Sequence, residues 1–137
     1  MYIQNTLKLP LKGKCHCGKI KFELSCNLND LKRCNCSHCR RKGFVMTTVK
    51  LNEFKLISGK ESLKIYQWNT KIAKHYFCMN CGINTHHQRR SKPDEYGVNT
   101  GCLEGFNMDW IKDVKYTEGI KFSIESKINK DASLIEE

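Results

Sequence analysis

The sequence of 137 residues predicts a mainly β fold, and two observations lead to this prediction. Apolar and polar side chains alternate in several short runs, which is the period of half-buried strands. Turn-forming residues separate these runs, for example Ser58-Gly59 and Lys92-Pro93-Asp94. Only Met108 to Lys112 shows a helical period, over a single turn. Since the chain has no linker, low-complexity tract or long repeat, we expect a single domain over residues 1–137.

The predicted strands follow one another along the chain. The first is the clearest, because Ile20, Phe22 and Leu24 alternate with charged residues directly after a cysteine turn. Further strands are predicted at residues 43–49, 53–57, 62–68, 73–77, 83–88, 96–102 and 119–125. The polar residues 126–137 are expected to fray at the end of the domain.

Nine cysteines are the most unusual feature of the composition. Their odd number, without a secretory leader or an apolar stretch of membrane-spanning length, argues against a disulfide framework. We therefore expect a soluble cytoplasmic protein with reduced thiols. Three clusters have the spacing of metal ligands, namely Cys15-x-Cys17, Cys34-x-Cys36-x-x-Cys39 and Cys78-x-x-Cys81.

Two of these clusters are followed by a glycine, Gly18 in one and Gly82 in the other. Glycine accepts the left-handed backbone of a tight turn, in which amide groups approach the cysteine sulfur atoms. The two clusters therefore look like halves of one closed zinc site. Such a site is structural, because its binding free energy is largely folding free energy. Its predicted ligands are Cys15, Cys17, Cys78 and Cys81.

The remaining cluster, Cys34, Cys36 and Cys39, has three thiols with arginines on both sides. We call it the cysteine trio. Three protein ligands and one exchangeable position are typical of a catalytic zinc. The alternative is a second closed site, whose distant fourth ligand would come from Cys26, Cys102, His38, His75, His86 or His87. Of these, His38 fits poorly because it stands between two ligating cysteines.

The formal net charge is +10, from 24 basic and 14 acidic residues. Two zinc ions held by seven thiolates would lower it to about +7. The lysines are scattered along the chain, which argues against a nucleic-acid groove. Beside the trio, the basic residues are predicted to offset the charge of the site or to hold substrate carboxylates, although a solvated surface charge explains any single one more simply. These residues are Arg33, Arg40, Arg41 and Lys42.

Four motifs follow one another between about residues 12 and 106, namely GKCHCGKIKFE (13–23), CNCSHCRRKG (34–43), FCMNCG (77–82) and VNTGCLEG (98–105). Together they resemble the glutathione-dependent formaldehyde-activating enzyme and centromere protein V family. The resemblance implies an Mss4-like fold of twisted antiparallel sheets with two zinc ions per chain. It implies the same division of ligands, with a structural zinc on the four cysteines and a catalytic zinc on the trio. One departure is Asn35, where the family commonly has histidine.

The resemblance also implies an activity. The founding enzyme reversibly condenses glutathione with formaldehyde to S-(hydroxymethyl)glutathione and is classed as a carbon–sulfur lyase. A zinc held by three thiolates suits this reaction, because a thiol in the fourth position ionises and can attack an aldehyde. The implied partners are a glutathione-like thiol and a small aldehyde, with no membrane, and the oligomeric state stays open. The alternative is a non-enzymatic zinc module that binds nucleic acid or a protein through a basic surface.

Overall fold

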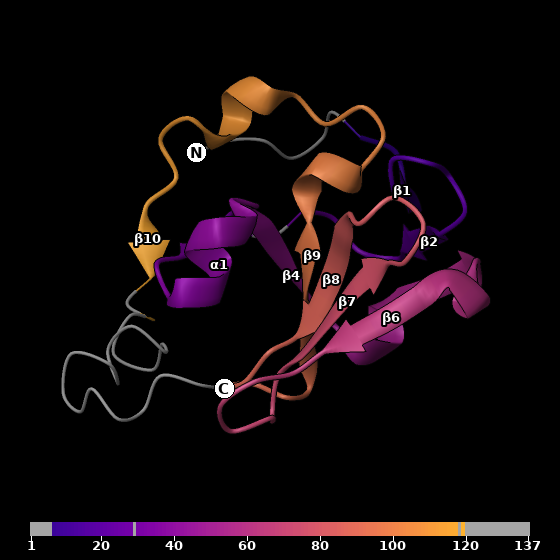
Figure 1. Cartoon of the computed structure of the whole chain (residues 1–137). Helices are drawn as coiled ribbons and strands as arrows, with labels where there is room; N and C mark the ends of the chain where they lie inside the picture. Colours follow the sequence, from indigo (N-terminus) through magenta and orange to yellow (C-terminus); the bar gives the residue numbers. More distant parts are fainter. Residues whose placement is uncertain (1–6, 29, 118, 120–137) are drawn as a thin grey trace, which may run out of the picture.

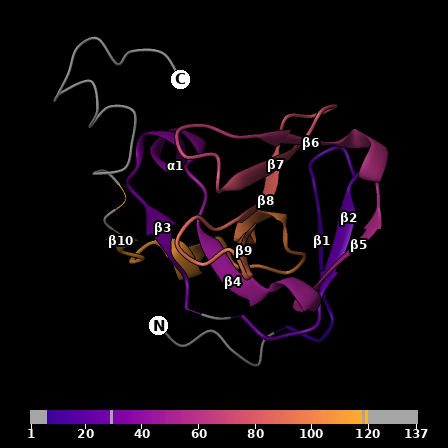
Figure 2. The same ribbon diagram turned by 90° about the horizontal axis from the view of Figure 1, so that it is seen from below.

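The structure, a computed structural model, describes residues 7–28, 30–117 and 119, and they form two stacked antiparallel sheets with a third layer on one side (Figures 1 and 2). The larger sheet has the strand order β4-β9-β8-β7-β6. Its strands are β4 (Met46–Lys50), β6 (Leu63–Tyr66), β7 (Lys74–Cys78), β8 (Asn84–Gln88) and β9 (Glu95–Asn99). The smaller sheet has the order β1-β2-β5 and contains β1 (Leu11–Lys14), β2 (Lys21–Leu24) and β5 (Phe54–Ser58).

The third layer covers the face of the larger sheet that is turned away from the smaller sheet (Figure 2). It holds the helix α1 (Ser37–Lys42) and a parallel pair formed by β3 (Arg33–Cys34) and β10 (Tyr116–Thr117). Four 3₁₀ turns complete the described elements, namely η1 (Leu51–Glu53), η2 (Lys60–Ser62), η3 (Thr100–Cys102) and η4 (Met108–Ile111).

The core lies between the two sheets. Phe22 and Leu24 of β2 are 1% and 0% exposed, as their alternation predicts, and they pack with Val49 and Val98 of the larger sheet. The ring of Phe22 stacks on that of Phe54, with 5.0 Å between the ring centroids. Burial of an apolar side chain of this size stabilises a domain by roughly 1.5–3 kcal/mol, so this cluster holds the sandwich together.

The register of β7 and β8 decides which side chains reach each face of the larger sheet. His75 lies opposite His87, and Tyr76 lies opposite His86. Successive side chains of a strand point to opposite faces. His86 therefore packs between the sheets, where it stacks on Phe54 at 4.2 Å, whereas His75 and His87 face the third layer.

The mainly β prediction is confirmed, with differences at the ends of elements. The strand predicted at 43–49 begins at Met46, because α1 occupies residues 37–42 and ends in the left-handed turn at Gly43. The strand predicted at 96–102 ends at Asn99, where η3 follows. The short helical period near Met108 is η4. The strand predicted at 119–125, apart from residue 119, and the predicted frayed tail 126–137 lie outside the described residues.

Candidate functional site

The four cysteines predicted to form a closed site come together at one end of the sandwich. The Sγ atoms of Cys15, Cys17, Cys78 and Cys81 all lie within 4.8 Å of one another. Cys17 Sγ is 3.6 Å from Cys15 Sγ and 3.7 Å from Cys78 Sγ. Four sulfurs arranged tetrahedrally around zinc at 2.3 Å would be about 3.8 Å apart, so the spacing fits this ion.

The two turns of this cluster form as their glycines predict. Gly18 has φ 82° and Gly82 has φ 79°, and their amides donate to the carbonyl oxygens of Cys15 and Cys78 at 3.2 and 2.7 Å. In the same turns, amide N–H groups approach the sulfurs, for example Ile20 N to Cys15 Sγ at 3.4 Å. Such hydrogen bonds stabilise thiolates that hold a metal. Cys15, Ile20 and Cys78 are also buried together in a second small core.

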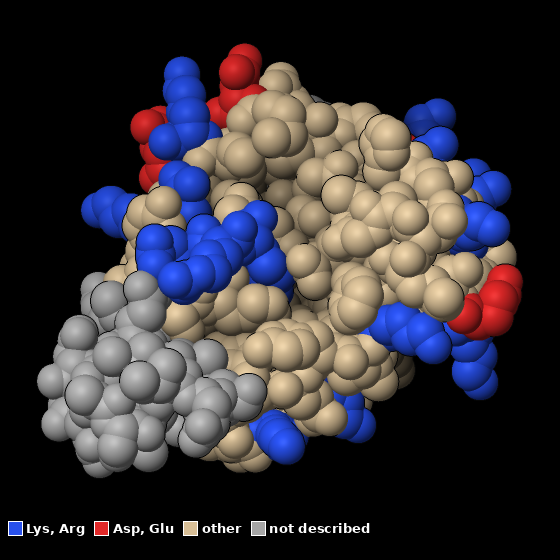
Figure 3. All heavy atoms as spheres, in the orientation of Figure 1, with Lys and Arg blue, Asp and Glu red and all other residues tan. Residues whose placement is uncertain are grey.

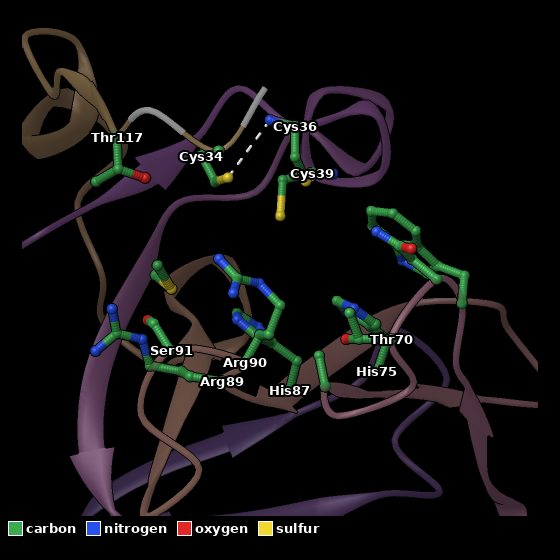
Figure 4. Close-up of a pocket in the computed structure, with 15 residues that line it drawn as sticks. Cys34, Cys36, Cys39, Thr70, His75, His87, Arg89, Arg90, Ser91 and Thr117 are labelled. Atoms are coloured by element: carbon green, nitrogen blue, oxygen red, sulfur yellow. Dashed lines mark hydrogen bonds between the residues drawn. The ribbon is translucent and has the colours of Figure 1, made fainter. Parts of the chain in front are cut away.

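The cysteine trio lies in the third layer. Cys34 ends β3, Cys36 is the N-cap of α1, and Cys39 follows in its first turn. The three Sγ atoms lie within 4.8 Å of one another. The amide of Cys36 donates to Cys34 Sγ at 3.4 Å (Figure 4), and the amide of Cys39 donates to Cys36 Sγ at 3.3 Å. The local chain thus folds around the sulfurs as a metal-binding loop does.

Because the three thiols lie close together, the pKa values of Cys34 and Cys39 shift in opposite directions. The pKa of Cys34 falls far below its usual value, chiefly because the Cys36 thiol hydrogen-bonds its thiolate and the Cys39 thiol adds to this. The pKa of Cys39 rises, because its hydrogen bond to Cys34 is lost on ionisation. Since zinc needs thiolate ligands, metal binding here releases protons.

A pocket of about 390 Å³ opens directly beside the trio. All three cysteines line it, and across the pocket from them lie His75, His87 and the three residues after β8 (Figure 4). Those three are Arg89, Arg90 and Ser91. A side wall comes from the loop between β6 and β7, where Trp68 Nε1 donates to His38 Nδ1 at 3.3 Å. The described lining residues include no aspartate or glutamate, so the lining favours a negatively charged guest.

The distant fourth ligand of the alternative model is not found among the described residues. Among the described residues, no histidine, carboxylate or further cysteine joins the trio with a ligand atom within 4.8 Å of its three sulfurs. His86 faces the other sheet, and its pKa is lowered to about 3 by burial. Cys102 packs into the main core and Cys26 packs against it. His38, His75 and His87 lie around the pocket without joining the group.

The arginines beside the trio have structural partners. Arg33 Nε donates to the carbonyl oxygen of Val114 at 2.9 Å, and its guanidinium lies over the ring of Tyr116. Arg41 donates to the carbonyl oxygen of Ser37 at 2.8 Å, within α1. Arg40 is exposed on the same helix. One group of basic side chains lies over α1, and the others are dispersed around the face seen in Figure 3.

The arginines that line the pocket, Arg89 and Arg90, were not singled out from the sequence. Arg89 NH1 forms an ion pair with Glu95 Oε1 at 2.6 Å. The pairing of β8 with β9 brings these residues together, and a single sequence does not disclose that register. The sequence does show two consecutive arginines directly after the strand predicted at residues 83–88, and this is the signal that could have identified them.

Asn35, the departure from the family pattern, ties the trio to the end of the described chain. Its side-chain Oδ1 accepts a hydrogen bond from the backbone amide of Gly119 at 2.9 Å, and its backbone amide donates to Thr117 O at 3.3 Å. Thr117 and Gly119 both line the pocket beside Cys34.

Most of the chain is similar to known proteins. Residues 10–117 match the family of the glutathione-dependent formaldehyde-activating enzyme. The crystal structure of a Rhodobacter sphaeroides protein, a structural genomics target, is similar with a TM-score of 0.73. Its sequence is 46% identical, and the match covers 77% of this chain and 99% of that chain. The described residues contain no helix with the length and hydropathy needed to cross a bilayer.

Proposed function

Since the chain belongs to the glutathione-dependent formaldehyde-activating enzyme family, we propose that it is a zinc-dependent carbon–sulfur lyase. In the proposed reaction, a thiol such as glutathione adds reversibly to formaldehyde or to another small aldehyde. The observation that carries the proposal is the contrast between the two cysteine clusters. One gathers four sulfurs against a small core, whereas the other gathers three beside a pocket.

Cys34, Cys36 and Cys39 would hold the catalytic zinc. Zinc at this position supplies Lewis acidity, which lowers the pKa of a thiol that occupies the remaining place. The amides of Cys36 and Cys39 hydrogen-bond the sulfurs and offset part of their negative charge. The other four cysteines would hold a second zinc, and their role is to fix the fold.

The charge of the pocket favours a thiol that carries carboxylates. Arg89 and Arg90 lie across the pocket from the trio (Figure 4). The ion pair with Glu95 holds Arg89 in a defined orientation. A guanidinium binds a carboxylate through two parallel hydrogen bonds, so this side of the pocket suits the carboxylate ends of glutathione. Arg33, Arg40 and Arg41 remain predicted sources of positive charge.

The loop between β6 and β7 forms the wall that would keep water from the reacting groups. Trp68 lines the pocket and is held to α1 by its hydrogen bond to His38. The His38 ring also contacts Tyr66 edge to face, with 5.3 Å between centroids. Exclusion of water matters because charged groups interact more strongly in a dry site.

Exchange NMR of ¹³C-formaldehyde with glutathione tests this proposal. Zinc-loaded wild-type protein should accelerate exchange between free formaldehyde and the glutathione adduct. Cys39→Ser should abolish the acceleration, and Cys26→Ser, which changes a cysteine outside both clusters, should retain it. A zinc-loaded wild type that does not accelerate exchange, but binds DNA with strong salt dependence, would favour the non-enzymatic module.

A further inference from the structure

Three histidine side chains lie in or beside the pocket, in addition to the cysteine trio. His75 and His87 lie opposite each other on β7 and β8, and their rings stack with 5.3 Å between centroids. Both side chains line the pocket. The ring of His38, on α1, meets that of His75 edge to face at 4.1 Å. Three imidazoles therefore gather beside the trio, on a lining without carboxylates among the described residues.

Lys42, in the last turn of α1, reaches the ring of His75. Its Nζ lies 3.3 Å from His75 Nδ1. An ammonium group has only donors, so with Lys42 in that form Nδ1 accepts this hydrogen bond and the ring proton belongs on Nε2. The Nζ also lies 4.0 Å from the centre of the Phe44 ring, a contact that favours the ammonium form. Burial lowers the pKa of Lys42, and negative charge on the cysteines of the trio opposes that shift.

His75 stays neutral in these surroundings. Burial is the main cause of its lowered pKa, and the charge of Lys42 adds to it. His87 is 6% exposed and stays neutral for the same reason, and its Nδ1 has no hydrogen-bond partner in the described structure. Since Nδ1 of His75 is occupied by Lys42, Nε2–H is the group with which this pocket-lining ring can meet a bound molecule.

We propose that His75 donates a hydrogen bond from Nε2 to the aldehyde oxygen, and that Lys42 is the positioning residue that holds His75 in this tautomer. This inference rests on the proposed function. It adds a site for the oxygen of the second substrate, beside the place proposed for the thiol. The donor is fixed before the reaction, which is the arrangement that best stabilises a developing negative charge.

The step balances with thiol and aldehyde alone. The thiolate sulfur forms a bond to the carbonyl carbon, and the π electron pair of the C=O bond moves to the oxygen. His75 Nε2–H donates to that oxygen as its negative charge grows. The proton that the thiol gave up on ionisation returns to the oxygen through solvent, and the product is a single hydroxyl compound. No oxidant, reductant or further reactant is needed.

The tautomer is tested by ¹⁵N NMR of the zinc-loaded protein. In the wild type we expect the Nε2 of His75 to carry the proton and Nδ1 to show the shift of an unprotonated acceptor. Lys42→Met keeps the aliphatic stem and removes the ammonium group, so it should give a mixture of tautomers. A wild-type His75 protonated on Nδ1 would overturn the inference, whatever the activity of the protein.

Exchange kinetics test the role in the reaction. His75→Phe keeps an aromatic ring and removes the donor, so kcat should fall about 10²- to 10³-fold, the usual effect of losing one such donor, while KM for glutathione stays within about twofold. His75→Gln places an N–H group near the position of Nε2 and should recover at least tenfold of that loss. Tyr76→Phe, the next residue on the opposite face of the sheet, is the matched control and should leave kcat unchanged.

A failure of the role proposed for His75 can be told apart from a failure of the proposed function. If the wild type accelerates exchange and His75→Phe, with its full zinc content, is equally active, only the present inference is wrong. If the wild type binds zinc and glutathione without accelerating exchange, the proposed function is wrong and the aldehyde role of His75 falls with it.

Discussion

Cys78→Ser should unfold the domain. Cys78 is 0% exposed at the end of β7 and packs with Ile20 and Cys15 in the second core. A structural zinc site contributes about 10–16 kcal/mol of apparent binding free energy, all of it available to folding. A folded chain of 137 residues is typically stable by about 7–20 kcal/mol, at about 0.05–0.15 kcal/mol per residue. The two quantities are of the same size, so loss of this metal removes most or all of the stability.

The assay compares Cys78→Ser with Cys36→Ser, which removes a ligand from the trio. Far-UV circular dichroism, urea unfolding and zinc analysis are measured on both variants and on the wild type. Cys36 lies at the N-cap of α1 and belongs to neither hydrophobic core, so its variant should lose one zinc and keep the sandwich. A Cys78→Ser protein that unfolds cooperatively at nearly the wild-type urea concentration would refute this reasoning.

Three further predictions concern the stability of the fold and the binding of thiol in the pocket. Gly59→Ala would place a methyl group against the backbone of Lys19, whereas Gly43→Ala meets nothing within 4 Å, and both glycines have positive φ. Urea unfolding should therefore show a loss of about 1–2 kcal/mol for Gly43→Ala and a clearly larger loss for Gly59→Ala; equal losses would contradict the packing argument. Burial lowers the pKa of His86 to about 3, so below about pH 6.5 the unfolded chain binds a proton that the folded chain does not, and stability falls with falling pH. His86→Phe should reduce that slope by up to about 1.4 kcal/mol per pH unit in urea unfolding between pH 7 and 5, and an unchanged slope would count against a neutral, buried His86. Glutathione binding should change the fluorescence of Trp68 in the pocket wall, and a signal of the same size in Trp68→Phe would place the thiol elsewhere.

The cysteine clusters were predictable because their information is local. Cysteine spacing and the glycines that follow two of the clusters are enough to divide the seven cysteines into a group of four and a group of three, and the observed sulfur groups match that division. The alternation of Ile20, Phe22 and Leu24 likewise predicts which side chains enter the core. Each of these signals is written in a few consecutive residues.

The pocket was less predictable because it depends on pairing between distant segments. Arg89 and His87 reach it through the registers of β7, β8 and β9, which a single sequence does not contain. The helix α1 was missed because six residues are too few to show a period, although Gly43 and the basic residues before it are typical of a helix end. His86 and His87 point to opposite faces because the side chains of a strand alternate, but which of the two faces the pocket depends on how the distant layers pack.

The most direct test of the central claim is zinc K-edge X-ray absorption on the fully loaded wild type, with and without glutathione. With one zinc on four cysteines and one on three, the average without thiol should be about 3.5 sulfur ligands per zinc. Added glutathione should raise that average to about 4 as its sulfur replaces a lighter ligand. An average of 4 before glutathione is added, unchanged afterwards, would mean that the second site is closed and would contradict the account.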